Sequence, residues 1–262
     1  MLTEEQTKYF EIFGFIVMRN YLSPSETNEI SGKFDQALAA DRQGMPFDGQ
    51  QRQCVYSVPE SLFPWLIYDD RIYEPLEQML GPGFVWIGSD SNLYVGDTGW
   101  HPDAPTDLRY EGIKVAFYLD PVTKDTGCLR VIPGSHRPPM HDQLRTLIKR
   151  DDPDASPLVE PRNVPCFPLE SQPGDVVFFN HNTWHAAFGG QTGRRMFTLN
   201  VKTRPTTERH IQYMRDTYQR NLEYQDGHQS TNRGRLYDDA FLHSDRPRIK
   251  SMVGKVLELG FK

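Results

Sequence analysis

The stretch GIKVAFYLD, residues 112–120, shows the pattern that decides the fold of this chain. Its apolar positions alternate with the other positions, as expected of a half-buried β-strand. The apolar face comprises Ile113, Val115, Phe117 and Leu119, and the opposite face comprises Lys114, Ala116 and Tyr118. We predict a strand whose apolar face packs on helices and whose other face looks toward a more polar space.

Short β-rich runs of the same kind lie on both sides of this strand. They are FVWIGSDSNLYVG (84–96), CLRVIPGS (128–135), GDVVFF (174–179) and RRMFTLNV (194–201). Gly, Pro, Asp and Asn separate the runs, and short strands with such turn signals are typical of a sandwich or barrel. We therefore expect a β core over about residues 84–203.

The flanks of this core show helical patterns. Capping boxes at Thr3–Gln6 and Ser23–Glu26 predict helices over about 3–13 and 23–40, with a strand at 15–18 between them. Further helices are expected at about 70–80, from residue 206 to about 220, and over the last amphipathic piece, 249–261. For about 140–165 we expect a helical turn and an insertion loop. No linker divides the chain, so we expect a single domain over residues 1–262.

Composition restricts the class of protein. The net charge of −6 lacks the basic excess of nucleic-acid-binding proteins, so we expect no nucleic-acid partner. No window approaches 18 apolar residues and no signal-peptide pattern is visible, so we expect no membrane association. The 3 cysteines are scattered, which favours a reducing compartment and a cytoplasmic location.

The segment GWHPD, residues 99–103, places His101 and Asp103 two positions apart between two predicted strands. Side chains at i and i+2 of an extended backbone point the same way, so both could face one metal ion. A second match to this spacing, His243-Ser244-Asp245, precedes Pro247. For that match we expect Ser244 or Asp245 to cap the last helix.

A third ligand is offered by His185 in FFNHNTWHAAFGG, after the strand GDVVFF. Two histidines and one carboxylate leave three open positions on an octahedral metal, an arrangement that suits iron(II) oxygenases. His181 lies four residues earlier, but the following HAAF segment and Arg194, nine residues later, favour His185. Arg194 could then bind a remote carboxylate through two parallel hydrogen bonds.

Three segments lie in register around WHPD, namely GFIVMRNYLSPSE (14–26), TGCLRVIPGSH (126–136) and PGDVVFFNHNTWH (173–185). In WHPD and these three segments, the chain resembles the phytanoyl-CoA dioxygenase family. This family belongs to the Fe(II)/2-oxoglutarate-dependent oxygenases. The resemblance covers most of the chain to about residue 203. It implies a mainly β fold with flanking helices, the double-stranded β-helix or cupin-like jelly roll. It also implies that His101, Asp103 and His185 bind the iron.

The resemblance further implies 2-oxoglutarate and O2 as co-substrates. We expect Arg194 rather than Arg195 to bind 2-oxoglutarate, because Arg195 shares the strand face expected to pack on helices. Asn92, on the strand before WHPD, is the second candidate contact. Many relatives have Ser two residues after the distal His, whereas this chain has Ala187. Relatives that halogenate carry a small residue at the position of Asp103, so Asp103 favours hydroxylation or a related C–H oxidation.

Other readings of the same residues remain. One alternative is a non-catalytic cupin-like module that binds a small ligand at the barrel mouth. Another is a zinc hydrolase, which is disfavoured because it would require a nearby general base and has no use for Arg194. Fold kinship does not choose the substrate, which we expect to be a small molecule. His136 is expected to be structural. Four basic residues could attract an anionic substrate, but we expect them to be isolated surface charges: Arg109, Lys114, Arg130 and Arg137.

Overall fold

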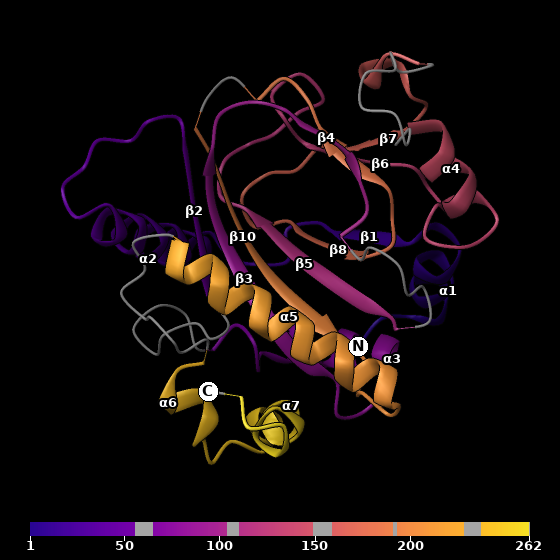
Figure 1. Ribbon diagram of the computed structural model, residues 1–262. Helices are drawn as coiled ribbons and strands as arrows, with labels where there is room; N and C mark the ends of the chain where they lie inside the picture. Colours follow the sequence, from indigo (N-terminus) through magenta and orange to yellow (C-terminus); the bar gives the residue numbers. More distant parts are fainter. Residues whose placement is uncertain (56–64, 104–109, 149–158, 191–192, 228–236, 262) are drawn as a thin grey trace.

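The computed structural model describes residues 1–55, 65–103, 110–148, 159–190, 193–227 and 237–261, and it contains two antiparallel sheets that face each other (Figure 1). The larger sheet has the order β1 (Phe15–Met18), β8 (Val176–Asn180), β5 (Gly112–Tyr118), β10 (Arg194–Lys202), β3 (Val85–Tyr94) and β2 (Gln50–Val55). The smaller has the order β4 (Thr98–His101), β9 (His185–Ala187), β6 (Leu129–Val131) and β7 (Phe167–Leu169). The prediction of a mainly β, jelly-roll architecture is confirmed.

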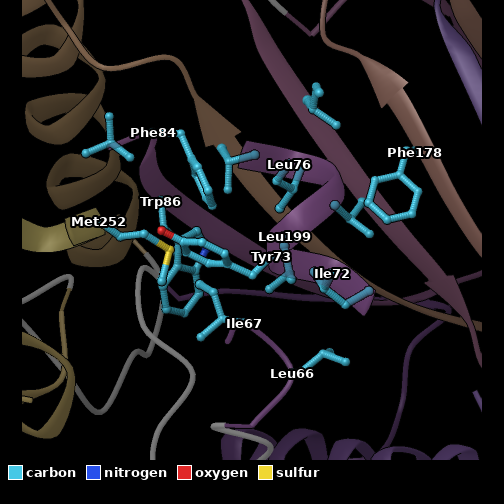
Figure 2. Packing of buried hydrophobic residues seen from close by; sticks show 14 of the residues in the cluster. Leu66, Ile67, Ile72, Tyr73, Leu76, Phe84, Trp86, Phe178, Leu199 and Met252 are labelled. Carbon is cyan, nitrogen blue, oxygen red and sulfur yellow. The ribbon is translucent and has the colours of Figure 1, made fainter. Parts of the chain in front are cut away.

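Strand β5 has the two faces that its alternation predicts. Ile113, Val115 and Phe117 are buried in the main core with side chains from helices, and Figure 2 shows part of this core, including Leu76, Leu199 and Met252. Ala116 and Tyr118, on the opposite face, belong to a second cluster that joins the two sheets. The larger sheet therefore presents its outer face to helices and its inner face to the space between the sheets.

The helices lie mainly outside the sheets, as predicted. They are α1 (Glu4–Phe13), α2 (Pro24–Arg42), α3 (Asp70–Leu80), α4 (Met140–Ile148), α5 (Glu208–Gly227), α6 (Asp239–Leu242) and α7 (Pro247–Glu258), with a short 3-10 helix at Pro161–Asn163. Both predicted capping boxes are present at α1 and α2. Within the described residues, no helix is both long enough and apolar enough to cross a bilayer.

Two details differ from the sequence expectations, and one expectation falls mostly outside the described residues. Strand β2 has the polar sequence QQRQCV, which carries no apolar alternation, so it was not expected. Helix α7 has Arg246 as its N-cap without a side-chain cap, so the expectation of Ser244 or Asp245 at that position is wrong. The Arg246 backbone N–H instead donates to the Ser244 hydroxyl at 3.3 Å. Most of the expected insertion loop, 149–158, lies outside the described residues.

Candidate active site

A cavity of about 340 Å³ opens between the two sheets. It brings together the five residues predicted from the sequence to bind the metal or 2-oxoglutarate, namely Asn92, His101, Asp103, His185 and Arg194. It is also lined by Asp90, Tyr94, Thr98, Lys114, Tyr118, Leu129, Phe179, Ala186, Ala187 and Met196. Residues more than 90 positions apart in the sequence thus share one pocket.

The pairing of β4 with β9 positions the two histidines. His101 and His185 are direct antiparallel partners, and their ring centroids lie 4.3 Å apart. Their neighbour Trp100 is buried with Trp184 and Phe188 in a separate cluster. Because successive side chains alternate across a strand, burial of Trp100 on that side turns His101 toward the cavity.

Asp103 lies just beyond the end of β4. Its backbone N–H donates to the His181 carbonyl at 2.8 Å, which fixes this turn. The Nε2 atom of His101 is 4.0 Å from Asp103 Oδ1, and the Nε2 atom of His185 is 3.8 Å from Oδ2. One potential ligand atom from each of the three residues lies within 4.8 Å of the other two. His101, Asp103 and His185 are hereafter the triad.

Both triad histidines have their tautomer fixed by the backbone. The Nδ1 atom of His101 is 2.8 Å from the Gly99 carbonyl oxygen, and the Nδ1 atom of His185 is 2.8 Å from the Thr183 carbonyl oxygen. A carbonyl oxygen only accepts hydrogen bonds, so Nδ1 carries the proton and Nε2 keeps its lone pair. This is how metal-binding histidines are commonly oriented, and the triad therefore fits a divalent metal ion.

Electrostatics keep two triad members in the protonation state that a metal requires. Burial lowers the pKa of His185 to about 4, although the Asp103 carboxylate opposes this. Burial would raise the pKa of Asp103, but Lys114 foremost, and then His185 and His181, hold it well below its ordinary value. At neutral pH His185 is therefore neutral and Asp103 is ionised, as metal coordination needs.

Lys114 is not an isolated surface charge, so that expectation is wrong. Its side chain is 14% exposed and its Nζ atom lies 2.9 Å from Asp103 Oδ2, in an ion pair whose geometry falls short of a hydrogen bond. The signal was present in the sequence, because Lys114 lies on the polar face of the strand 112–120. Arg130 contacts the Phe188 ring, and Arg109 lies outside the described residues.

The two adjacent arginines of β10 point to opposite faces of the larger sheet. Arg194 is 8% exposed and lines the cavity, where its guanidinium lies 5.0 Å from the centre of the Tyr94 ring. Arg195 contacts Asp120 at 2.7 Å and Asp35 of α2 at 2.8 Å, away from the cavity. Of the two, Arg194 is therefore the residue placed to meet a ligand in the pocket.

Two glycines leave room for the Arg194 guanidinium. A Cβ atom on Gly127 or on Gly190 would overlap Arg194 Nη1. Arg194 Nη1 also donates to the Gly96 carbonyl at 3.3 Å. Gly127 belongs to the TGCLRVIPGSH segment, so part of that motif forms a cradle around the arginine. The fixed guanidinium suits two-pronged binding of a carboxylate.

The remaining candidates have clear places. Asn92 lines the cavity from β3, opposite Met196 of β10. His181 is buried, but its backbone carbonyl, not its ring, engages Asp103, and it is outside the group that could hold a metal. His136 lies 3.2 Å from the Glu11 carbonyl, a structural contact, as expected. His243 lies at the end of α6, and its side chain is 73% exposed.

The chain was compared with curated proteins. The uncharacterized proteins Mb1539 of Mycobacterium bovis and Rv1501 of Mycobacterium tuberculosis are each 29% identical to it over 124 residues. The match covers 46% of this chain and 40% of each relative. This chain thus spans about two fifths of the length of the curated relatives it matches.

Solved structures share the fold at low identity. EvdO2 from Micromonospora carbonacea, complexed with 2-oxoglutarate, is 22% identical with a TM-score of 0.57, over 79% of this chain and 93% of that chain. HygX from Streptomyces hygroscopicus, with nickel and 2-oxoglutarate bound, is 18% identical with a TM-score of 0.61, over 79% and 90%. SnoN, a non-heme alpha ketoglutarate dependent epimerase from nogalamycin biosynthesis, is 18% identical with a TM-score of 0.59, over 76% and 80%.

A family model provides the assignment. The model of phytanoyl-CoA dioxygenase matches residues 10–197, a range that contains the triad, Asn92 and Arg194. This range also includes every strand of the smaller sheet. The chain belongs to the phytanoyl-CoA dioxygenase family.

Proposed function

We propose that the chain is an Fe(II)- and 2-oxoglutarate-dependent dioxygenase, which oxidises a small-molecule metabolite at a C–H bond and releases succinate and CO2. The observation that carries the proposal is the triad, in which two histidine Nε2 atoms and one carboxylate converge. This donor set suits non-haem Fe(II) oxygenases. The 2-oxoglutarate bound to EvdO2 and HygX supports the same co-substrate here, and another structure of HygX, with iron bound, supports the same metal.

The triad would hold the iron, with each Nδ1–H kept on its backbone carbonyl. When bound, the iron supplies the oxidative chemistry, with 2-oxoglutarate and O2 as co-substrates. The residues of this chain orient the reactants and restrict water. Apolar walls from Leu129, Phe179 and Met196 line the cavity beside the triad.

Arg194 would bind the distal carboxylate of 2-oxoglutarate from its glycine cradle. The Thr98 hydroxyl is a second hydrogen-bond donor for this carboxylate. Thr98 of β4 is the direct partner of Ala187 of β9, and both residues line the cavity. Side chains of directly paired residues lie about 5 Å apart, so the Thr98 hydroxyl can serve where relatives use a serine at the position of Ala187. Asn92 is the proposed third contact from β3.

Asp103 favours hydroxylation among the oxidations open to this family, and desaturation or demethylation remains within the proposal. The occurrence of SnoN in nogalamycin biosynthesis supports a small metabolite as the substrate class. We propose one oxygenase domain over residues 1–262, since α1 contacts β1 and α7 contacts β3 of the same sheet. The scattered cysteines support a cytoplasmic location.

The proposal is tested by anaerobic titration of the protein with Fe(II) and 2-oxoglutarate, followed by admission of O2 and measurement of succinate. We expect a weak visible charge-transfer band that requires both additions, and slow succinate release without substrate. A screen of metabolites for stimulated succinate release then identifies the substrate. Absence of the band and of succinate would instead favour the non-catalytic ligand-binding module.

A further inference from the structure

A row of charged and polar side chains crosses the inner face of the larger sheet next to the triad. It consists of Lys114 on β5, Thr198 and Asn200 on β10, and Asp90 on β3. The strands are adjacent, with Asn200 paired with Lys114 and Thr198 paired with Asp90. The row thus runs across three neighbouring strands and ends at Asp103, to which Lys114 is bound.

Asp90 is a fixed anchor in this row. It is 8% exposed, and its Oδ2 atom accepts hydrogen bonds from Thr198 Oγ1 and from Asn200 Nδ2, each at 3.3 Å. The same oxygen lies 4.0 Å from Lys114 Nζ. Lys114 therefore lies between two carboxylates, one held by the sheet and one belonging to the triad.

The contact of Lys114 with Asp103 selects one carboxylate oxygen. Lys114 Nζ is 2.9 Å from Oδ2, which also lies 3.8 Å from His185 Nε2, whereas Oδ1 lies 4.0 Å from His101 Nε2. A carboxylate can bind a metal ion through one oxygen or through both. An ammonium group held at Oδ2 competes with the second mode, because it balances the charge that this oxygen would offer to the metal.

The number of bound oxygens matters for the reaction. Two histidines and one carboxylate oxygen leave three positions of an octahedral ion open, which two atoms of 2-oxoglutarate and one O2 molecule would fill. A carboxylate bound through both oxygens would occupy one of these positions. The lost position would be one that either 2-oxoglutarate or O2 needs.

We propose that Lys114 is a positioning residue, which restricts Asp103 to binding through one oxygen and so preserves the third open position of the metal. Asp90 holds the lysine in place from the far side of the row. The inference rests on the proposed function, because it concerns the same metal centre. Lys114 touches neither 2-oxoglutarate nor O2 in this role and acts only through Asp103.

The test uses nitric oxide as a neutral probe of the third position. The full chain is loaded anaerobically with Fe(II) and 2-oxoglutarate and titrated with nitric oxide, and the iron–nitrosyl signal is followed by electron paramagnetic resonance. The variants are Lys114→Met, Lys114→Gln and the conservative Lys114→Arg. The matched control is Lys124→Met, because Lys124 also lies beside an aspartate, Asp125, at 4.0 Å, but its side chain is 62% exposed.

We expect Lys114→Met and Lys114→Gln to retain Fe(II) affinity but to bind nitric oxide at least about tenfold more weakly, since one ligand position is taken. Lys114→Arg and Lys124→Met should match the unmodified chain. Because nitric oxide is uncharged, loss of the lysine charge alone does not explain such a change. A nitric oxide affinity unchanged in Lys114→Met and Lys114→Gln would overturn the inference, as would loss of Fe(II) binding or of the folded state in both. If the unmodified chain does not bind Fe(II), the proposed function itself fails.

Discussion

His101 and His185 lie directly opposite each other on β4 and β9, with ring centroids 4.3 Å apart. Each ring has its Nδ1–H bound to the carbonyl of the residue two positions earlier. These backbone contacts help to direct the two Nε2 atoms toward Asp103. A metal ion entering this site would need little rearrangement of its ligands, which lowers the cost of binding.

The first prediction concerns the triad. Changing His101 or Asp103 to Ala is expected to abolish both Fe(II) binding and substrate-independent succinate formation, because two remaining ligands hold the ion weakly. The fold should survive in both variants, since His101 and Asp103 are partly exposed and belong to none of the hydrophobic clusters. Fe(II) titration, succinate assays and thermal melting together check this.

The second His-x-Asp sequence provides the control. His243→Ala and Asp245→Ala alter the same residue types at the same spacing, but their side chains are 73% and 100% exposed. Both variants should keep the metal affinity and the activity of the unmodified chain. Succinate formation that persists unchanged in the His101 and Asp103 variants would refute the metal assignment.

The second prediction separates the two arginines of β10. Arg194→Lys should raise the Kd for 2-oxoglutarate by at least about tenfold, because an ammonium cannot reproduce the two-pronged contact. Arg195→Lys should leave that Kd nearly unchanged. Its effect should fall on stability, by about 1 kcal/mol, because it weakens partly exposed contacts with Asp120 and Asp35. Calorimetric titration of the metal-loaded protein and urea unfolding measure the two quantities.

The reverse outcome, a larger Kd for 2-oxoglutarate in Arg195→Lys than in Arg194→Lys, would show that the cavity-facing arginine is not the 2-oxoglutarate ligand.

The third prediction tests the cradle around Arg194. A methyl group at Gly190 would overlap both the Arg194 guanidinium and the Gly96 carbonyl oxygen, although Gly190 does not have a positive φ, so Gly190→Ala removes space from Arg194 and from the backbone that holds it. We expect about tenfold weaker 2-oxoglutarate binding with unchanged Fe(II) affinity. Gly254→Ala, in α7, meets no atom within 4 Å and serves as the control. Equal 2-oxoglutarate affinity in both variants would mean that the guanidinium can shift without loss.

The sequence predicted the fold well, because strand alternation and turn signals are local patterns, and it singled out the three residues that the structure brings together. Alternation in residues 112–120 assigned the two faces of β5, and the Arg194 and Arg195 faces followed from the same period. Strand β2 was not predicted because it lies at the edge of the sheet, where apolar residues are not required, and its sequence QQRQCV contains few of them.

The surroundings of the triad were harder to predict because they depend on pairing between distant strands. The contact between Lys114 and Asp103 needs the end of β4 to lie beside β5, which no spacing along the chain reveals. The glycine cradle likewise joins Gly127 and Gly190 to Arg194 only in three dimensions. The alternation did place Lys114 on the polar face, yet a lone lysine on such a face is usually solvated.

The last prediction concerns His136 and acid stability. His136 is buried against Gly14, where its Nε2 atom lies 3.2 Å from the Glu11 carbonyl. Burial, reinforced by Arg137, lowers its pKa from 6.5 to about 4. As the pH falls below 6.5, the unfolded chain binds a proton that the folded chain does not accept until about pH 4. The free energy of unfolding therefore decreases as the pH falls from 6.5 to about 4, and it keeps its full value above pH 6.5.

His136→Gln should reduce this dependence while keeping a donor for the Glu11 carbonyl. The pKa difference corresponds to at most about 3 kcal/mol at acid pH. Because the pKa of His185 is also lowered, both proteins will lose stability on acidification, so the diagnostic quantity is the difference between them. Urea unfolding of the unmodified and variant chains at pH 7.5 and pH 4.5 measures it. Equal losses in the two proteins would show that His136 is already protonated in the folded chain or remains accessible to water.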